Sequence, residues 1–209
     1  MAGNQFTSGD DPRLIPPGWD YNPATWSQRI PIVVLALAGA GISIYLAIYQ
    51  YDMLDRVWEP FFGESKEPDK NSSEYILSSE LSFPLERLHP ALAISDAALG
   101  AAAYLVDAIT GVIGGRGRWR KMPWVVVMFA FFVGPLGLTS VFLTVAQPVL
   151  YGQWCTLCLG SAAISLLMIG PAMDEALASC QFLRRVYDTP GVSLWKAFWG
   201  RHSCNSFPH

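Results

Sequence analysis

The sequence predicts an all-α integral membrane protein, a four-helix transmembrane bundle with a long external loop between the first two helices. Two observations predict this class. Of the 209 residues, 52% are hydrophobic and only 15% are charged, whereas about 25% of the residues in an average soluble domain are charged. The charges are also unevenly distributed, since residues 122–173 contain no Asp, Glu, Lys or Arg. Both observations disfavour a soluble globular domain.

The composition also excludes two other classes of protein. The 14 Lys and Arg residues against 17 Asp and Glu residues give a net charge of -3, and a nucleic-acid binder needs a basic surface. Eight Trp, eight Tyr and eleven Phe residues do not fit a disordered chain, which is poor in aromatic residues. We therefore expect membrane lipid around this chain, and no nucleic acid.

The first two spans follow from length and charge, because a transmembrane helix needs about 20 mostly apolar residues. Residues 30–51 contain no charged residue and are predicted to form the first span. Residues 92–114 form the second, in which Asp96 and Asp107 are the only charged residues. Residues 1–29 lack the basic and apolar segments of a signal peptide and are expected to form an irregular cytoplasmic leader that packs on the bundle or on a partner.

The charge-free stretch is long enough to cross the membrane twice. We predict spans at about residues 123–147 and 154–173, with a turn at 147–154, where a Pro and a Gly disfavour a continuous helix. The predicted bundle then extends over residues 30–178. It leaves residues 179–209 as a cytoplasmic tail.

The basic residues predict the orientation. The connection 114–121 carries four positive charges and no negative ones, and such connections stay in the cytoplasm. Both termini are then inside, whereas the loop 52–91, with nine acidic and four basic residues, and the turn before Trp154 are outside. The expected location is the cytoplasmic membrane. Asp107, near the inner end of its span, is expected to pair with the basic connection.

The four cysteines are divided between the two sides of this topology. Cys155 and Cys158 begin the fourth span at its external end, whereas Cys180 and Cys204 lie in the tail, where free thiols are expected. A Cys-x-x-Cys pair at a helix N-terminus favours the thiolate and a reversible disulfide. Helical spacing puts Cys158 one turn deeper and leaves Cys155 facing water. Such a pair can pass electrons between an aqueous thiol and a lipid-soluble acceptor.

A Cys-x-x-Cys pair can also have two other roles, in a metal site or as a structural element. A zinc site needs two further ligands, and the external segments contain no other cysteine and a single histidine, His89, so no metal is expected. A structural or idle cysteine pair is the remaining alternative.

The predicted spans, the external loop and three motifs resemble the vitamin K epoxide reductase family, whose bacterial members make disulfides with the help of a quinone. The likeness covers about residues 30–178. The motifs are the Trp-Cys-x-x-Cys-Leu run at 154–159, the loop segment 75–79, and the segment 96–104 in the second span. Their order along the chain matches the order of the predicted spans.

The resemblance implies a redox-active disulfide between Cys155 and Cys158, with Cys158 beside a quinone, either ubiquinone or menaquinone. It also implies that Asp96 occupies a position from which some members bind a quinone carbonyl. A carboxyl group inside a membrane is costly unless it is paired or protonated, which makes Asp96 a functional candidate in itself. An interfacial Asp that caps the helix is the alternative. Ser79 and Trp154 complete the candidate quinone-binding residues.

The external loop departs from the family pattern. Typical members carry a second cysteine pair there, which takes electrons from a thioredoxin-like partner, and here the corresponding positions hold Ser73 and Ser65. A serine cannot form the mixed disulfide. Two functions therefore stay open: a thiol-disulfide oxidoreductase that an external, thioredoxin-like dithiol reaches directly, or a redox-inactive structural or assembly subunit of a larger membrane complex.

Two aromatic segments also have two interpretations each. Residues 58–63, directly after the first span, form either a belt at the membrane interface or a lid over the quinone pocket. Residues 194–199 in the tail suit either lipid headgroups or a neighbouring subunit.

Overall fold

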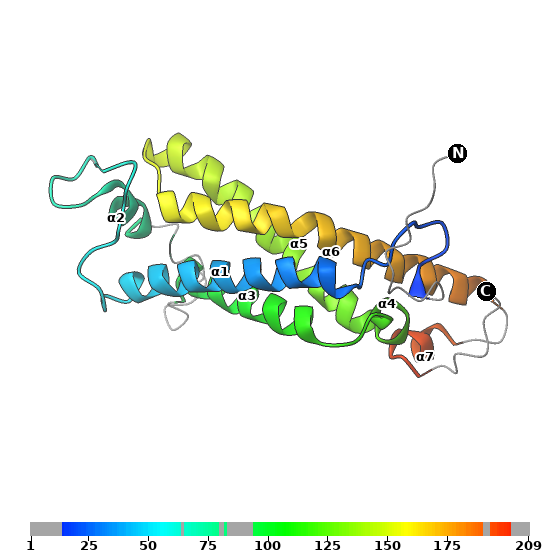
Figure 1. The fold of residues 1–209 in the computed structure, drawn as a ribbon. Helices are drawn as coiled ribbons and strands as arrows, with labels where there is room; N and C mark the ends of the chain where they lie inside the picture. Colours follow the sequence, from blue (N-terminus) through cyan, green and yellow to red (C-terminus); the bar gives the residue numbers. More distant parts are fainter. Residues whose placement is uncertain (1–13, 64, 80–81, 83–93, 190–192, 202–209) are drawn as a thin grey trace.

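Every regular element of the described chain is a helix, which confirms the predicted all-α class for this part of the protein. The computed structural model describes residues 14–63, 65–79, 82, 94–189 and 193–201. The long helices pack side by side, with α2 at one end and with α4 and α7 at the other (Figure 1). The long helices are α1 (Trp26–Gln50), α3 (Asp96–Val112), α5 (Pro123–Ala146) and α6 (Thr156–Asp188), and the short ones are α2 (Ser72–Leu77), α4 (Arg118–Lys121) and α7 (Leu194–Phe198).

Three of the described helices are long and apolar enough to cross a membrane. They are α1, α6, and α5 together with the π-helical turn that extends it to Tyr151. Helix α3 is shorter, with 17 residues. It begins where the Ser95 hydroxyl accepts a hydrogen bond from the Ala98 N–H at 3.1 Å, and it ends before Gly114, whose φ of 84° favours glycine.

The turn between α5 and α6 lies in the second half of the predicted segment. Pro148 does not end the helix, because Gln147–Tyr151 continues it as a π-helix, whose wider hydrogen-bond pattern accommodates a residue without an N–H. The chain reverses at Gly152, which has a left-handed φ of 64°. Cys155 then forms the N-cap of α6, so the cysteine pair directly follows the reversal.

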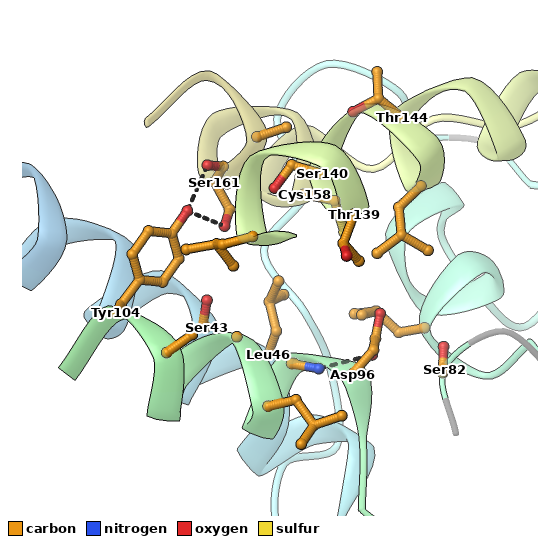
Figure 2. A pocket seen from close by; sticks show the side chains of 18 of the residues that line it. Ser43, Leu46, Ser82, Asp96, Tyr104, Thr139, Ser140, Thr144, Cys158 and Ser161 are labelled. Atoms are coloured by element: carbon orange, nitrogen blue, oxygen red, sulfur yellow. Dashed lines mark hydrogen bonds between the residues drawn. The ribbon is translucent and has the colours of Figure 1, made fainter. Parts of the chain in front are cut away.

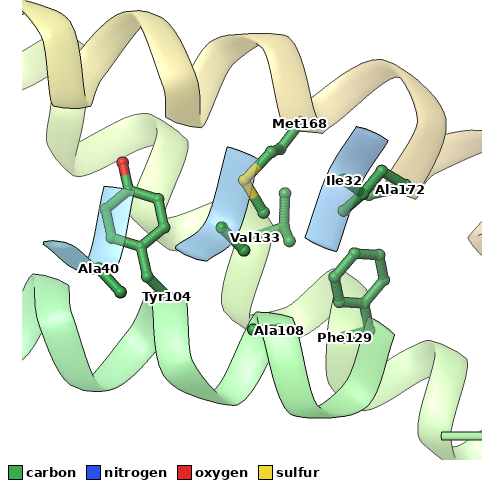
Figure 3. Packing of buried hydrophobic residues seen from close by; sticks show 9 residues of the cluster. Ile32, Ala40, Tyr104, Ala108, Phe129, Val133, Met168 and Ala172 are labelled. Atoms are coloured by element: carbon green, nitrogen blue, oxygen red, sulfur yellow. The ribbon is translucent and has the colours of Figure 1, made fainter. Parts of the chain in front are cut away.

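The core lies where the four long helices meet (Figure 3). Its buried residues come from all four helices: Ile32, Ala36, Ala40, Tyr104, Ala108, Phe129, Val133, Met168 and Ala172. Helices α1 and α3 approach closely because two glycines face large side chains. A Cβ atom on Gly39 would lie 2.6 Å from the ring of Tyr104, and one on Gly111 would lie 2.8 Å from Val33. Small residues at such contacts are a general means of packing membrane helices.

We expect Gly39→Ala to destabilise the bundle by about 1–3 kcal/mol, the usual cost of overpacking a core, because the new methyl group would overlap the Tyr104 ring. Gly41→Ala is the matched control, since Gly41 lies on the same helix with open space around it. Alanine there should stabilise the helix slightly. Thermal unfolding of both purified variants in one detergent measures the difference, and equal unfolding temperatures would contradict the close contact.

Two buried arginines hold the end of α3 at the α4 side of the bundle. Arg118 and Arg29 are each 1% exposed. Arg118 binds both carboxylate oxygens of Glu175 on α6, which is equally buried. Both arginines also donate to carbonyl groups at the C-terminal end of α3, which otherwise have no partner inside the helix; these are the carbonyls of Thr110, Gly111, Ile113 and Gly114.

The prediction that Asp107 pairs with the basic connection is wrong. Its side chain is fully buried, and neither of its carboxylate oxygens has a hydrogen-bond partner among the described residues. Asp107 lies on the same buried face of α3 as Tyr104 and Ala108, which directs it into the bundle. Arg118, in the connection itself, pairs with Glu175 instead.

The described part of the leader, residues 14–25, packs on the same end of the bundle. The Trp19 indole donates a hydrogen bond to Gln181 at 3.1 Å, and the Tyr21 hydroxyl donates one to Asp174 at 2.7 Å. Both acceptors lie on α6, which continues beyond the predicted end of the span at residue 173. The first 13 residues of the leader lie outside the described residues, as do His89 and, in the tail, His202, Cys204 and His209.

Candidate active site

The two cysteines of the Cys-x-x-Cys motif form a disulfide at the start of α6. Their Cα atoms lie 5.2 Å apart. The Cys158 N–H lies 3.2 Å from the Cys155 sulfur, and the Cys155 N–H donates to the side-chain oxygen of Gln147 at 3.1 Å. The disulfide is therefore held by the first turn of α6 and by the π-helical end of the preceding helix. Cys180, by contrast, is an exposed free thiol.

The surroundings of the two sulfur atoms differ, and those of Cys155 are not the predicted ones. Cys155 has no exposed surface, so the expectation that it faces water is wrong. Cys158 is partly exposed and lines a cavity. The prediction failed because helical spacing describes the bundle alone, whereas the loop that follows α1 folds over the start of α6.

A cavity of about 450 Å³ lies beside Cys158. Residues from all four long helices, from α2 and from the π-helical turn line it. Most of the lining is apolar. Figure 2 shows Asp96, Tyr104, Ser140 and Cys158 around this space. A largely apolar cavity with a few polar groups suits a small, mostly apolar ligand.

Asp96, the first residue of α3, contributes a carboxyl group to the lining of this cavity. One of its oxygens accepts hydrogen bonds from the Gln50 side chain at 2.7 Å and from the Ala97 N–H at 2.8 Å. The second bond comes from the neighbouring residue in the first turn of α3, and the N-cap of this helix is Ser95. Gln50 is itself buried, and its side-chain oxygen has no partner among the described residues.

Another wall of the cavity carries a network of hydroxyl groups that the sequence did not predict. The Tyr104 hydroxyl lies 2.5 Å from the hydroxyl of Ser165 and 3.0 Å from that of Ser161, and Ser165 lies 3.0 Å from Ser140. Tyr104, Ser140 and Ser161 line the cavity. Tyr104 stands in the motif 96–104, but serines are frequent in membrane helices, and nothing in their spacing marks these three.

The cavity brings together three of the predicted site residues: Cys158, Asp96 and Ser79. Trp154 does not line it, because its ring stacks on Phe62 with the centroids 6.3 Å apart. No residue of the aromatic segment 58–63 lines the cavity either. This segment lies over the start of α6, not over the pocket.

The loop that follows α1 forms a cap over the disulfide, which we define as residues 57–63 and 65–79. Ser72 donates a hydrogen bond to the Trp154 carbonyl at 2.5 Å. Glu59 accepts hydrogen bonds from the Thr156 N–H at 2.9 Å, from the Thr156 hydroxyl and from the Ser73 hydroxyl. The cap therefore binds directly to the residues on either side of Cys155.

Comparison with known protein families identifies the family of this chain. The model of the vitamin K epoxide reductase family matches residues 30–172, which include the cavity and both cysteines. This chain belongs to the vitamin K epoxide reductase family. Quinone is the general electron partner of that family. No curated protein matches the chain.

The loop positions at which the family's second cysteine pair is expected hold serines that support the fold of the cap. Ser73 is fully buried and donates to Glu59. The Ser65 hydroxyl donates to the carbonyls of Glu67 and Lys70 at 2.8 and 2.7 Å. Both serines therefore take part in hydrogen bonds within the cap.

Proposed function

We propose that this protein is a membrane thiol-disulfide oxidoreductase, in which a quinone bound in the cavity oxidises the Cys155 and Cys158 thiols. The observation that supports this most strongly is that one largely apolar cavity is lined by Cys158, Asp96 and Ser79. Family membership independently supports quinone as the electron partner.

The lining residues fit a quinone, ubiquinone or menaquinone, because such a ligand needs an apolar surface for its ring and a few hydrogen-bonding groups for its oxygens. The protonated carboxyl group of Asp96 and the hydroxyl of Ser79 are the proposed donors to those oxygens, and Gln50 holds the Asp96 carboxyl in place through its 2.7 Å hydrogen bond. A bound quinone would take up the two electrons and two protons that the two thiols release when their disulfide forms.

The proposed electron donor is an external, thioredoxin-like dithiol. Its thiolate attacks the Cys155 sulfur, the bond to Cys158 breaks, and a mixed disulfide forms. The second thiol of the donor then attacks this mixed disulfide. The donor leaves oxidised, and both cysteines of the chain are reduced and ready to be oxidised again.

We propose the predicted membrane topology, in which α3 crosses the membrane in addition to α1, α5 and α6 and is the second of the four spans. The proposed domain limits are 1–29, 30–178 and 179–209. In this orientation the cap and the disulfide are external, and α4 and α7 are cytoplasmic. The basic connection supports it. The exposed Trp195 and Trp199 of the α7 region suit the interfacial region of the lipid.

Trapping of thiols tests the function. The purified protein is reduced, freed of reductant, incubated with ubiquinone or menaquinone, and labelled with a maleimide that adds a known mass to each thiol. We expect Cys155 and Cys158 to be labelled before quinone is added and protected afterwards. Thiols that stay reactive with both quinones would contradict the proposal.

We expect Asp96→Leu to lower kcat/KM for the quinone by about tenfold, the effect of losing one hydrogen bond in the cavity. Asp96→Asn replaces the carboxyl group with an amide, whose N–H can donate a hydrogen bond, so this variant should lose less of its kcat/KM. Asp107→Asn is the control, since Asp107 is buried on the same helix but does not line the cavity. Steady-state kinetics with varied quinone measure the effect, and equal losses at positions 96 and 107 would argue against a quinone contact.

A second candidate function is that of a redox-inactive subunit of a larger membrane complex. The complete burial of Cys155 beneath the cap favours it. It predicts that a stoichiometric partner stays bound in mild detergent and that cellular function survives the joint Cys155→Ser and Cys158→Ser exchange. Loss of function in that double variant would exclude it.

A further inference from the structure

We propose that Glu59 controls the access of aqueous thiols to Cys155. While its side chain binds the start of α6, the cap stays closed, and a dithiol reaches the cysteine pair only when this contact breaks. The inference rests on the proposed function, because it concerns how electrons reach the same disulfide. It assigns a positioning residue that acts through the cap.

The Glu59 side chain joins three separate segments of the chain. From α6 it receives hydrogen bonds from the N–H and the hydroxyl of Thr156, and from α2 it receives one from the buried hydroxyl of Ser73. The N–H groups of Phe61 and Phe62, in its own segment, donate to it at 3.1 and 3.2 Å. Losing this one side chain would therefore remove the hydrogen bonds that join the cap to Thr156, in the first turn of α6.

The charge of Glu59 suits this place. Burial raises the pKa of its carboxyl, but the hydrogen bonds from Ser73, from Thr156 and from the Phe61 backbone outweigh burial and hold the pKa below its ordinary value. Glu59 is therefore ionised at neutral pH. An anion at a helix N-terminus is favourable, because the dipole is positive there and the first N–H groups lack partners in the helix.

The remaining cap contacts complete the cover over Cys155. Val57 is 4% exposed and belongs to the cluster against which Leu157 and Cys158 pack. Ser72 binds the Trp154 carbonyl, and Phe62 stacks on the Trp154 ring. With the cap in this position Cys155 has no exposed surface.

The two sulfur atoms are consequently reached by two routes. An apolar ligand inside the bundle meets Cys158 at the wall of the cavity, whereas an aqueous thiol has to displace the cap. The loop 52–91 contains no cysteine that could carry electrons across the cap by thiol exchange. Opening of the cap therefore takes the place of a relay.

Reduction of the disulfide by a charged phosphine tests the proposal. Tris(2-carboxyethyl)phosphine and water convert a disulfide into two thiols and a phosphine oxide, and the charges of this reagent keep it out of an apolar cavity. Maleimide labelling followed by mass measurement gives the rate. We expect Glu59→Gln to be reduced at least about tenfold faster than the unmodified protein, the effect of losing charged hydrogen bonds.

The matched control is Glu67→Gln, which removes the same charge from the same loop. Glu67 is exposed, and among the described residues its carboxylate forms an ion pair with Lys70 alone, at 3.0 Å. The Glu67→Gln variant should therefore keep the reduction rate of the unmodified protein. Ser73→Ala and Thr156→Val each remove hydrogen bonds to Glu59 and should give smaller increases. Equal rates in Glu59→Gln and the unmodified protein would overturn the proposal.

Hydrogen exchange separates opening of the cap from general unfolding. Glu59→Gln should increase deuterium uptake in peptides from the cap and from 153–160, and leave α1 protected. If deuterium uptake rises throughout the bundle, the phosphine reduction rates of Ser73→Ala and Thr156→Val are the deciding measurement. The proposal would be overturned if neither of these two variants is reduced faster than the unmodified protein. No quinone is present in this assay, so a failure of quinone to oxidise the pair would refute the proposed function and leave this result standing.

Discussion

Cys158→Ser is expected to abolish quinone-dependent oxidation of a dithiol, with a loss of about a thousandfold or more, as is usual when the reacting nucleophile of an enzyme is removed. Cys158 is the cysteine that lines the cavity, and a serine in its place cannot form or break a disulfide. The measurement is quinone-dependent loss of dithiol thiols in detergent or in vesicles.

The control for this prediction is Cys180→Ser. Cys180 is a free and exposed thiol on α6, outside the cavity, so its variant should retain full activity. Cys155→Ser should be as inactive as Cys158→Ser, because the disulfide needs both sulfur atoms. If Cys158→Ser keeps activity while Cys180→Ser loses it, the proposed site is wrong.

Arg118→Met is expected to destabilise the protein by about 3–5 kcal/mol, the cost of leaving one buried charge without its partner. Arg118 and Glu175 are each 1% exposed, so Glu175 would lose its ion pair in the interior. The carbonyls at the end of α3 would lose hydrogen bonds as well. Thermal or denaturant unfolding in a fixed detergent measures the loss.

A double variant tests whether this loss comes from the pair itself. Arg118→Met combined with Glu175→Leu removes both charges and should cost clearly less than the sum of the two single changes. Arg184→Met is the control, since Arg184 is exposed on the same helix as Glu175. Additive losses in the double variant would show that the ion pair is not the source of the effect.

The helical class and the position of the cysteine pair could be predicted because both depend on neighbouring residues. A stretch such as 122–173, without a single charged side chain, can be satisfied by helices in lipid, where every backbone group bonds within its own segment. Likewise, the spacing of Cys155 and Cys158 at a helix start is a local property. The prediction that Cys158, Asp96 and Ser79 share a site relied on the family resemblance, and the cavity brings these three residues together.

The failed predictions concern contacts between distant parts of the chain. Cys155 was expected to face water, but Glu59, which lies 97 residues before Thr156 in the sequence, holds the cap over it. Asp107 was expected to pair with the basic connection, but Arg118 of that connection pairs with Glu175, 57 residues away. No local pattern indicates which of several charged residues will meet when the helices pack.

By itself, then, the sequence determined the helical class, the apolar segments and the helix end that carries the cysteine pair, because charge distribution and residue spacing act over one or two helical turns. Only the tertiary structure decided that the cap covers Cys155 and which carboxyl groups have partners. These outcomes depend on how α1, α3, α5 and α6 pack and on how the loop that follows α1 folds back. The free energies involved come from contacts that do not exist until the helices are assembled.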